Sequence, residues 1–338
     1  MCSNTSGAVK AKRVMKVSAW NIIKPYWFSE DRWKAWLLLG VVVGFSFLSV
    51  QVAVYIGIWT EKFFNALFSF NLKKALYLLP LYAVLSGSLS ACYVFKKYFM
   101  QALQMRWRQW NSKRFITLWL THLTYYNMEQ TPDAADNPDQ RIAEDLAKLS
   151  ELTLTLGFSV VQNVITLLSF GVVLWQVGGT LHFSLWHHAF AIPGYMLWTT
   201  LACAVGATFL VEKFSSPLVK TNYEQQKYEA NFRSSLVLFR KYSEQVAFYQ
   251  GENFAKEDFF KKLKDIKQNW RKVMTFTKRS TLVHELYTSG SWFVLCLMVI
   301  PKVIAKTLTA GEFQRINMAF TQVRNSIGWF VSDYTDIA

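Results

Sequence analysis

Long apolar stretches alternate with polar stretches along this chain. Each apolar stretch runs close to the ~20 residues that a helix needs to cross the hydrocarbon core of a bilayer. Six such stretches are expected, at residues 36–59, 75–95, 152–175, 194–211, 282–304 and 316–338. The pattern therefore predicts an all-α integral membrane protein with six transmembrane helices.

Two long polar stretches interrupt the apolar ones, at residues 101–151 and 212–279. The second carries 15 Lys or Arg against 8 Asp or Glu and has almost no Gly or Pro after Pro217. Such a composition favours long helices. We therefore predict that both stretches are helical extensions on the cytoplasmic side. Because basic residues concentrate in cytoplasmic loops, their distribution also predicts that both termini lie in the cytoplasm.

The N-terminal region divides into a tail and an elbow. Residues 1–18 are expected to form a disordered cytoplasmic tail, and residues 19–338 to form one transmembrane domain. Residues 19–33 alternate aromatic and charged side chains around Pro25. Such a segment suits an elbow helix in the membrane interface, with its aromatic rings at the depth of the headgroups. No short apolar segment with a cleavage site follows the basic tail, so a cleaved signal peptide is not expected.

The composition favours a membrane protein over a soluble one, because 52% of the residues are hydrophobic and only 17% are charged. The 14 Trp residues exceed what a soluble core usually needs, and Trp is enriched at membrane interfaces. A formal net charge of +15 could indicate nucleic-acid binding. The basic residues flank apolar stretches, however. The segment 105–115, in which basic and aromatic residues alternate, also follows such a stretch. Membrane anchoring is therefore the better interpretation, and no nucleic-acid partner is expected.

Neither the cysteines nor the histidines predict a metal site. The four cysteines have no metal-ligand spacing, and three lie inside apolar stretches, where Cys is usually a small buried hydrophobe. They are Cys2, Cys92, Cys203 and Cys296. The histidines of the loop at 177–193 are His182, His187 and His188. Adjacent histidines rarely share one ion and no carboxylate joins them, so we expect no disulfide and no bound metal.

A short, charged segment at residues 137–145 lies between two long apolar blocks. Asn137 and Pro138 are typical of a turn that starts a helix, and Asp139 then lies near the positive end of the helix dipole. One apolar stripe follows, formed by Ile142, Leu146 and Leu149. We predict a short helix below the membrane bundle, which another body could push. The alternative is a solvated helix face without a mechanical role.

Four polar side chains inside or beside the predicted spans are candidates for a substrate or proton path. Ionisable groups inside a bilayer are costly and usually functional. Glu285 could carry protons or bind a cationic substrate, or it could pair with a neighbouring basic residue such as Arg279. Arg324 could line the path or pair with Glu285, or it could form a structural ion pair. Gln162 and Asn163 are expected to make interhelical hydrogen bonds, with substrate contact as the alternative.

Several segments, in order along the chain, resemble the membrane domain of ABC half-transporters related to the SbmA/BacA peptide importers and the peroxisomal fatty-acyl transporters. The most specific is DNPDQRIAEDL at 136–146, because it sits in the predicted first cytoplasmic loop. The other segments are KPYWFSEDRWKAWLLL (24–39), WTEKFFNAL (59–67), MRWRQW (105–110), FRSSLVLFRKYSEQVAFYQGE (232–252) and FTQVRNSIGWFVSDYTDIA (320–338). The resemblance implies a transmembrane fold like that of type-1 ABC exporters.

In such families two copies assemble, and a helix in the first cytoplasmic loop couples the membrane domain to nucleotide hydrolysis. The resemblance therefore implies a coupling role for the charged segment described above. Its members are Asn137, Pro138, Asp139, Gln140, Arg141, Glu144 and Asp145.

The sequence departs from a complete ABC transporter in one respect. It contains no GxxxxGK[ST] run, the glycine loop whose amides hold nucleotide phosphates. We therefore expect no nucleotide-binding domain, no cofactor and no enzymatic activity in this chain, and ATP with Mg only on a separate or truncated domain. Three explanations stay open: an ATPase that is cut off or separately encoded, a proton-driven relative, or an inactive remnant. The WFVSDYTDIA segment favours the ATP-linked branch.

Together these features predict the transmembrane domain of a homodimeric transporter in the inner (plasma) membrane. The resemblance implies peptides or hydrophobic, vitamin-like molecules as substrates, and an ATPase domain absent from this chain as the motor. The alternative is a proton-coupled importer like SbmA/BacA, for which Glu285, Glu144 or Asp145 would have to titrate. A membrane scaffold without transport is a third possibility. The sequence leaves open which substrate is moved and in which direction.

Overall fold

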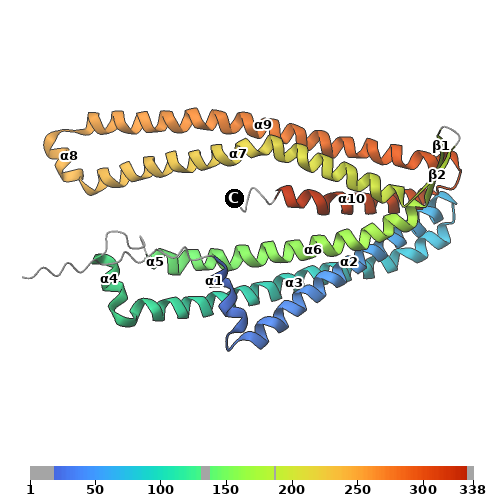
Figure 1. The fold of residues 1–338 in the computed structure, drawn as a ribbon, viewed down its shortest axis with the longest axis horizontal. Coiled ribbons are helices and arrows are strands. Elements are labelled where there is room, and N and C mark those ends of the chain that lie inside the picture. Colours follow the sequence, from blue (N-terminus) through green and yellow to red (C-terminus); the bar gives the residue numbers. More distant parts are fainter. Residues whose placement is uncertain (1–18, 131–137, 186–187, 333–338) are drawn as a thin grey trace, which may run out of the picture. The chain divides into compact units, whose positions relative to one another are not determined.

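The computed structural model describes residues 19–130, 138–185 and 188–332, and nearly all of them are helical (Figure 1). The first elements are the short helix α1 (Ala19–Ile23) and the 3₁₀ helix η1 (Lys24–Phe28). The later α-helices are α2 (Arg32–Phe68), α3 (Leu72–Leu120), α4 (Thr124–Gln130), α5 (Pro138–Gln140), α6 (Leu146–Gly178), α7 (Tyr195–Lys241), α8 (Ser243–Tyr249), α9 (Glu252–Ile304) and α10 (Ala310–Ser332). The remaining elements are the 3₁₀ turn η2 (Thr121–Leu123), the π-helical turn η3 (Arg141–Asp145) and the strands β1 (Thr180–Leu185) and β2 (His188–Pro193).

Within the described residues, five helices are long and apolar enough to cross a bilayer. They are α2, α3 with its continuation to Met128, the rod Pro138–Gly178, α7 and α9. The predicted helical membrane domain is thereby confirmed. Helix α10 coincides with most of the sixth predicted span, but Glu312, Arg315 and Arg324 make it more polar than the other five. The count of six spans stays a prediction.

The elbow predicted at residues 19–33 consists of two short helical pieces, α1 and η1. Pro25 lies in the first turn of η1, where a missing N–H breaks no helical hydrogen bond. The Ser29 hydroxyl ends this turn, because its Oγ donates to the Tyr26 carbonyl at 2.7 Å and accepts from the Asp31 N–H at 3.3 Å. The long helix α2 then starts directly after this capped turn.

The chain divides into two compact units, and α2, α3 and α6 each contribute to both. The first unit comprises the residues up to Ser49 together with Ser90–Val161. Its core forms where the elbow packs against α2, α3 and α6. Tyr26 and Trp107 are fully buried there, and their rings stack with centroids 5.7 Å apart. Burial of such large aromatic surfaces is the main stabilising term of this unit.

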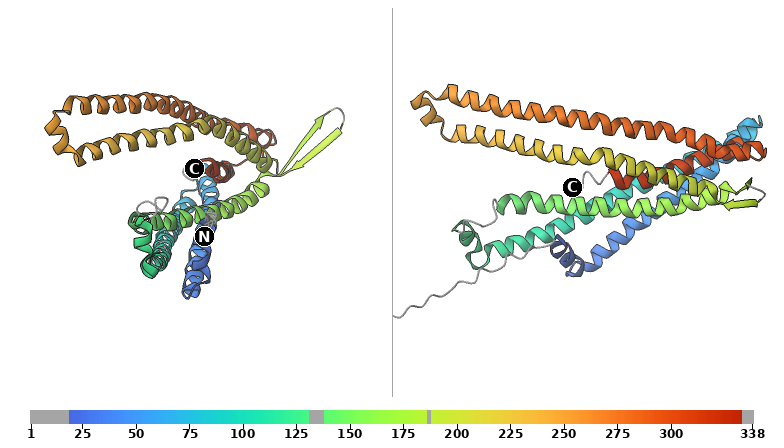
Figure 2. Two further views of the ribbon diagram at one scale, coloured as in Figure 1. Left: turned by 60° about the vertical axis from the view of Figure 1, so that its left-hand side comes forward. Right: turned by 45° about the horizontal axis from the view of Figure 1, so that its top comes forward.

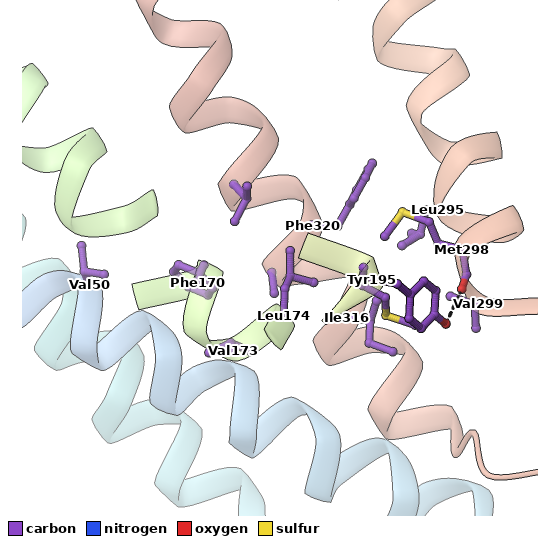
Figure 3. Close-up of a cluster of buried hydrophobic side chains, with 13 residues drawn as sticks. Val50, Phe170, Val173, Leu174, Tyr195, Leu295, Met298, Val299, Ile316 and Phe320 are labelled. Carbon is purple, nitrogen blue, oxygen red and sulfur yellow. Dashed lines mark hydrogen bonds between the residues drawn. The ribbon is translucent and has the colours of Figure 1, made fainter. Parts of the chain in front are cut away.

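The second unit comprises Val50–Leu89 together with the residues from Gln162 onward. Its core gathers apolar side chains from α2, α6, α7, α9 and α10 (Figure 3). Leu174 and Ile316 have no exposed surface. The Tyr195 hydroxyl enters this core and donates to the Met298 carbonyl at 2.8 Å, which satisfies a buried polar group.

An antiparallel hairpin of β1 and β2 replaces the loop predicted at 177–193. The alternation of polar and apolar residues in TLHFSL (180–185) is a strand signal that the prediction overlooked. Gly194 follows the hairpin with a φ of +60°, and a Cβ there would lie 2.2 Å from the Trp175 ring. Only glycine fits this position, because it tolerates positive φ and has no side chain.

The loops between helices that the sequence predicted at 61–74 and 302–315 are shorter in the structure. Helix α2 continues to Phe68 and α3 starts at Leu72, while α9 ends at Ile304 and α10 starts at Ala310. The segment at 59–68 contains neither Gly nor Pro, so nothing in it ends the helix before the turn.

The short helix predicted from the segment 137–145 is wrong as a separate element. Pro138–Gly178 is one helical rod, in which α5 continues through η3 into α6. No proline follows Pro138 in this rod, so its apolar stripe runs uninterrupted into the membrane span. Asn137 and the predicted tail at 1–18 lie outside the described residues.

In the second unit, α7 and α9 run side by side and are joined by the short helix α8 (Figures 1 and 2). Both helices extend far beyond the ~20 residues that a bilayer requires. Their polar parts coincide with the stretch 212–279, as the hydropathy pattern predicts.

Candidate functional site

A cavity of about 590 Å³ lies between α7, α9 and α10, and we call it the polar cavity because several polar side chains line it, although most of its surface is apolar. The residues that line it are Thr208, Val211, Ser215, Leu218, Ser280, Thr281, His284, Tyr287, Thr288, Arg324, Asn325, Gly328 and Trp329. Hydroxyl, imidazole, amide and guanidinium groups therefore face one space, although α7 and α9 are apolar enough to cross a membrane. Such convergence of polar groups in a concave site is typical of ligand binding.

The polar lining of α9 is a single helical stripe. Ser280, His284 and Tyr287 recur at spacings of four and three residues, which places them on one face of the helix. Ser291, four residues after Tyr287, continues this face beyond the cavity lining. At the start of this stripe, the hydroxyl oxygens of Ser215 and Ser280 lie 2.6 Å apart and link α7 to α9. The sequence analysis did not predict this stripe, although its spacing is visible in the sequence.

Arg324 brings a positive charge to the cavity. Its Nη1 donates to the Ser291 hydroxyl, and its Nε and Nη2 donate to Oδ1 of Asn325 at 3.2 and 3.1 Å. The guanidinium also lies 5.8 Å from the centroid of the Tyr287 ring, a cation–π distance. All of these partners are neutral.

The predicted pairing of Arg324 with Glu285 is not observed, and no carboxylate among the described residues forms an ion pair with this guanidinium. Neutral acceptors satisfy its N–H donors without cancelling its charge. The arrangement therefore favours an anion that enters the cavity from outside the chain.

Glu285 has a different environment from the one predicted. Its side chain is 67% exposed, and Oε1 lies 3.9 Å from Nδ1 of His284. His284 lines the cavity, whereas Glu285 does not. An imidazole and a carboxylate thus lie side by side at the edge of the cavity. The imidazole belongs to the lining, and the carboxylate lies outside it.

Gln162 and Asn163 do not join this site. Both are half-buried on α6, and neither lines the cavity. The main-chain carbonyl of Gln162 accepts from the Thr166 hydroxyl at 2.8 Å. A substrate contact by Gln162 or Asn163, the alternative given above, would therefore lie outside this cavity.

The charged segment at the start of the Pro138–Gly178 rod is solvent-facing. Asp139, Arg141, Glu144 and Asp145 are exposed, and Gln140 Nε2 donates to Glu144 Oε2 at 3.2 Å. These side chains are available to contact another molecule.

A hydrogen bond ties this segment to the neighbouring long helix. Nη2 of Arg108 on α3 donates to the Ala143 carbonyl at 3.2 Å. The accepting carbonyl lies in η3, a π-helical turn, and such turns often occur at functional sites.

Helix α8 was not singled out from the sequence, although it lies in the FRSSLVLFRKYSEQVAFYQGE segment. It is a seven-residue helix at the tip of the α7–α9 pair. Phe248 and Tyr249 at its end are 83% and 80% exposed, and Phe254 at the start of α9 is 81% exposed. Aromatic side chains that gather in solvent in this way usually mark a surface that another protein covers.

No three His, Cys, Asp or Glu side chains within residues 19–130, 138–185 and 188–332 are arranged to hold a metal ion. Cys92, Cys203 and Cys296 are free thiols. His187 and Cys2 lie outside the described ranges.

Comparison with known proteins places these features in a family. The model of the ABC transporter transmembrane region 2 matches residues 22–304. The inner membrane ABC transporter ATP-binding protein YddA of Escherichia coli is 28% identical over 319 residues, which cover 94% of this chain and 57% of YddA. The chloroplastic ABC transporter D family member 2 of Arabidopsis thaliana is 26% identical, over 92% of this chain and 41% of its own length. The human lysosomal cobalamin transporter ABCD4 is 23% identical, over 75% of this chain and 39% of its own length.

The chain spans about half the length of the curated relatives that it matches. The similarity covers the elbow, all five apolar helices and the charged segment at 138–145. It confirms the predicted relation to ABC half-transporters, including the D family, whereas a specific relation to SbmA/BacA stays a prediction. The chain is a multi-pass membrane domain, and it belongs to the ABC transporter transmembrane region 2 family.

Proposed function

We propose that this chain is the membrane half of a homodimeric transporter, in which two copies enclose the substrate path. An ATP-hydrolysing domain outside this sequence would drive the transport cycle. Family membership and relatives whose names include "ATP-binding protein" support this proposal. The proposed substrates are peptides or hydrophobic and vitamin-like molecules, and the name of one relative specifies cobalamin.

We place the chain in the inner membrane with α10 as its sixth span and both termini in the cytoplasm. The basic polar stretch at 212–279 supports this orientation through the positive-inside rule. The name of YddA specifies the inner membrane. In this arrangement the charged segment at 138–145 and helix α8 both project into the cytoplasm.

The polar cavity is the proposed substrate-contacting part of each copy, and Arg324 is its anchor. One observation carries this assignment: the Arg324 guanidinium faces a cavity of about 590 Å³, and its partners among the described residues are all neutral. A carboxylate or phosphate of the substrate would supply the missing charge, through charge-assisted hydrogen bonds. Tyr287 and Trp329 would contact the apolar part of the same molecule.

Coupling to the motor is assigned to two exposed elements. The charged segment from Pro138 to Asp145 is continuous with a helix that is apolar enough to cross a bilayer, so a force on its side chains would act on that helix directly. Helix α8 presents Phe248 and Tyr249 at the tip of the α7–α9 pair. An ATPase domain that binds both elements could change the separation of their helices.

A pair of probes that differ by one charge tests the role of Arg324. We would measure the binding of a dansyl-labelled hydrophobic peptide, as the free acid and as the C-terminal amide, to the purified protein in nanodiscs. The free acid should bind at least tenfold more tightly, because a hydrogen bond to a charged group contributes about 1.5–3 kcal/mol. Arg324→Gln should remove this preference, and Arg324→Lys should retain part of it.

Arg240→Gln is the matched control, because Arg240 is an exposed arginine in the last turn of α7, away from the cavity lining. This variant should keep the preference for the free acid. Equal binding of the two probes to the unaltered protein would reject Arg324 as an anion anchor. A protein that transports no member of a peptide and vitamin panel in liposomes would instead support the scaffold interpretation.

The proximity of His284 and Glu285 favours a second candidate function, a proton-coupled importer. This pair touches the cavity through its imidazole, so a proton exchanged there could accompany the substrate. Uptake would then persist without ATP and stop when a protonophore is added. Glu285→Gln should abolish that uptake, whereas full activity of this variant would reject the proton-coupled mechanism.

A further inference from the structure

A hollow of about 300 Å³ lies beside the elbow in the first unit, and it is separate from the polar cavity. Its lining residues are Trp33, Lys34, Leu37 and Leu38 of α2 and Arg106 of α3. The surface of the hollow is almost wholly apolar, so Lys34 and Arg106 line it mainly with the aliphatic parts of their side chains, beside three large apolar side chains. A ligand that fits this lining carries an anionic group next to a hydrocarbon part.

Arg106 is held in place by a carboxylate from the elbow. Its Nε donates to Asp31 Oδ2 at 3.1 Å, and its Nη2 donates to Asp31 Oδ1 at 2.8 Å. This hydrogen bonding holds the pKa of the Asp31 carboxyl below its usual value, so the carboxyl stays ionised. A guanidinium has five N–H donors, and this pairing leaves three of them for a second acceptor. The side chain of Arg106 is 37% exposed, so an outside ligand can reach it.

The packing beneath Arg106 makes this geometry rigid. Trp107, the next residue on α3, is fully buried and stacks on Tyr26 of the elbow. Nε1 of Trp36 donates to the Trp27 carbonyl at 3.3 Å and ties the start of α2 to the same elbow. A rigid scaffold keeps the arginine fork in one orientation, as a specific binding site requires.

Lys34 adds a charge that this part of the structure does not neutralise. It is exposed, and it forms no ion pair with a carboxylate of the described ranges. Lys34, Arg106 and Asp31 together sum to a charge of +1. The flanking side chains of Trp33 and Leu37 are 75% and 65% exposed. Tryptophan next to a basic residue at the end of an apolar helix is typical of headgroup depth.

We propose that this hollow binds an anionic phospholipid of the cytoplasmic leaflet. The start of an acyl chain fills the apolar hollow against Leu37 and Leu38, and the phosphate lies at its edge, within reach of the Lys34 ammonium and the Arg106 guanidinium. The net positive charge favours a lipid with a net negative charge over a zwitterionic lipid, whose ammonium group would meet Lys34. The lipid would fasten the elbow to the bilayer. The inference rests on the proposed orientation of the elbow, and it is independent of the transported substrate.

Photo-crosslinking in nanodiscs tests the site. We would reconstitute the purified protein into phosphatidylcholine nanodiscs with a trace of a photoreactive phosphatidylglycerol and map the labelled peptides by mass spectrometry. Labelling should fall on residues 32–39, and unlabelled phosphatidylglycerol should compete for it while extra phosphatidylcholine should not. Lys34→Ala should weaken the labelling about fivefold, the effect of one interfacial basic charge. Lys34→Arg should preserve it.

Lys74→Ala provides the matched control, because Lys74 is an exposed lysine at the first turns of α3 rather than at the elbow. This variant should label residues 32–39 as strongly as the unaltered protein does. Competition by inorganic phosphate would show a site for free anions and would overturn the lipid assignment. Equal competition by phosphatidylcholine, or labelling of Lys34→Ala at full strength, would overturn it as well. None of these outcomes depends on whether Arg324 binds a substrate.

Discussion

Helix α10 carries two arginines in opposite electrostatic environments. Nη1 of Arg315 donates to Glu61 Oε2 of α2 at 2.8 Å, and the two side chains are 19% and 30% exposed. Arg324 lies nine residues further along, and its contacts among the described residues are a hydroxyl, an amide and an aromatic ring. The same helix therefore neutralises one guanidinium within the chain and leaves the other without a countercharge from the described residues.

The region around Arg315 is built as a joint between helices. We call it the ion-paired end, and it comprises Glu61, Lys302, Glu312 and Arg315. Lys302 of α9 binds Glu312 of α10 and the Val177 carbonyl of α6. Each of the two ion pairs joins groups on different helices, so each pair holds two helices together. Among the described residues, no ion pair between helices lines the cavity, so the charge of Arg324 is not balanced there in the same way.

The largest effect on stability is expected from Gly311→Ala at the ion-paired end. A Cβ on Gly311 would lie 1.9 Å from the Glu61 carbonyl oxygen, and the Gly311 N–H would lose its 2.9 Å bond to Asn65 Oδ1. Helices α2 and α10 would have to separate, at a cost of about 3 kcal/mol. Thermal unfolding in detergent would measure it. Gly328→Ala is the control, because a Cβ there meets nothing within 4 Å, and equal loss in both variants would contradict the close contact.

A double-mutant cycle at Glu61 and Arg315 should show the next largest effect. Removing either partner leaves a partly buried charge unpaired and should cost about 2 kcal/mol, less than the ~3–5 kcal/mol of a fully buried pair. The double variant should cost less than the sum of the single variants, with a coupling of about 1 kcal/mol. The free energy of unfolding of the four proteins gives this coupling. Strict additivity would mean that the ion pair does not join the helices.

Arg324→Gln should not lower the free energy of unfolding, in contrast to the variants at Gly311, Glu61 and Arg315. It removes two kinds of favourable contact, but it also removes a charge that no described carboxylate balances. We expect the free energy of unfolding to stay unchanged or to rise by about 1 kcal/mol, measured under the same conditions as Arg315→Gln. A loss above about 1 kcal/mol would show that Arg324 is structural, and the comparison between the two arginines would then fail.

Much of the fold follows from the sequence because bilayer spans are defined by length and hydropathy. The apolar stretches at 36–59 and 282–304 lie inside α2 and α9, as predicted. The ends of the helices do not follow from hydropathy. Residues 61–68 look like a loop because they are polar at the start, yet they continue α2 because they contain no helix breaker.

The site was less predictable than the fold. Arg324 stands out in the sequence because a charge inside an apolar helix is rare. Its partner could not be read from the sequence, because Ser291 is one of many serines and its proximity depends on how α9 packs against α10. Glu285 was one of the alternatives for its partner on the basis of charge, but Glu285 does not line the cavity.

The smallest predicted effect concerns the ion pair between Asp31 and Arg106 in the first unit. The hydrogen bonds from Arg106 lower the pKa of Asp31 in the folded state, so the pair stabilises the fold above the unfolded pKa of about 3.9. This contribution is lost as the pH falls through the lower folded pKa. We expect about 1 kcal/mol or less, because the two side chains are 28% and 37% exposed. Unfolding measured from pH 7 down to pH 3 should show a smaller loss for Asp31→Asn than for the unaltered protein, and identical profiles would mean that Arg106 is held by the aromatic packing alone.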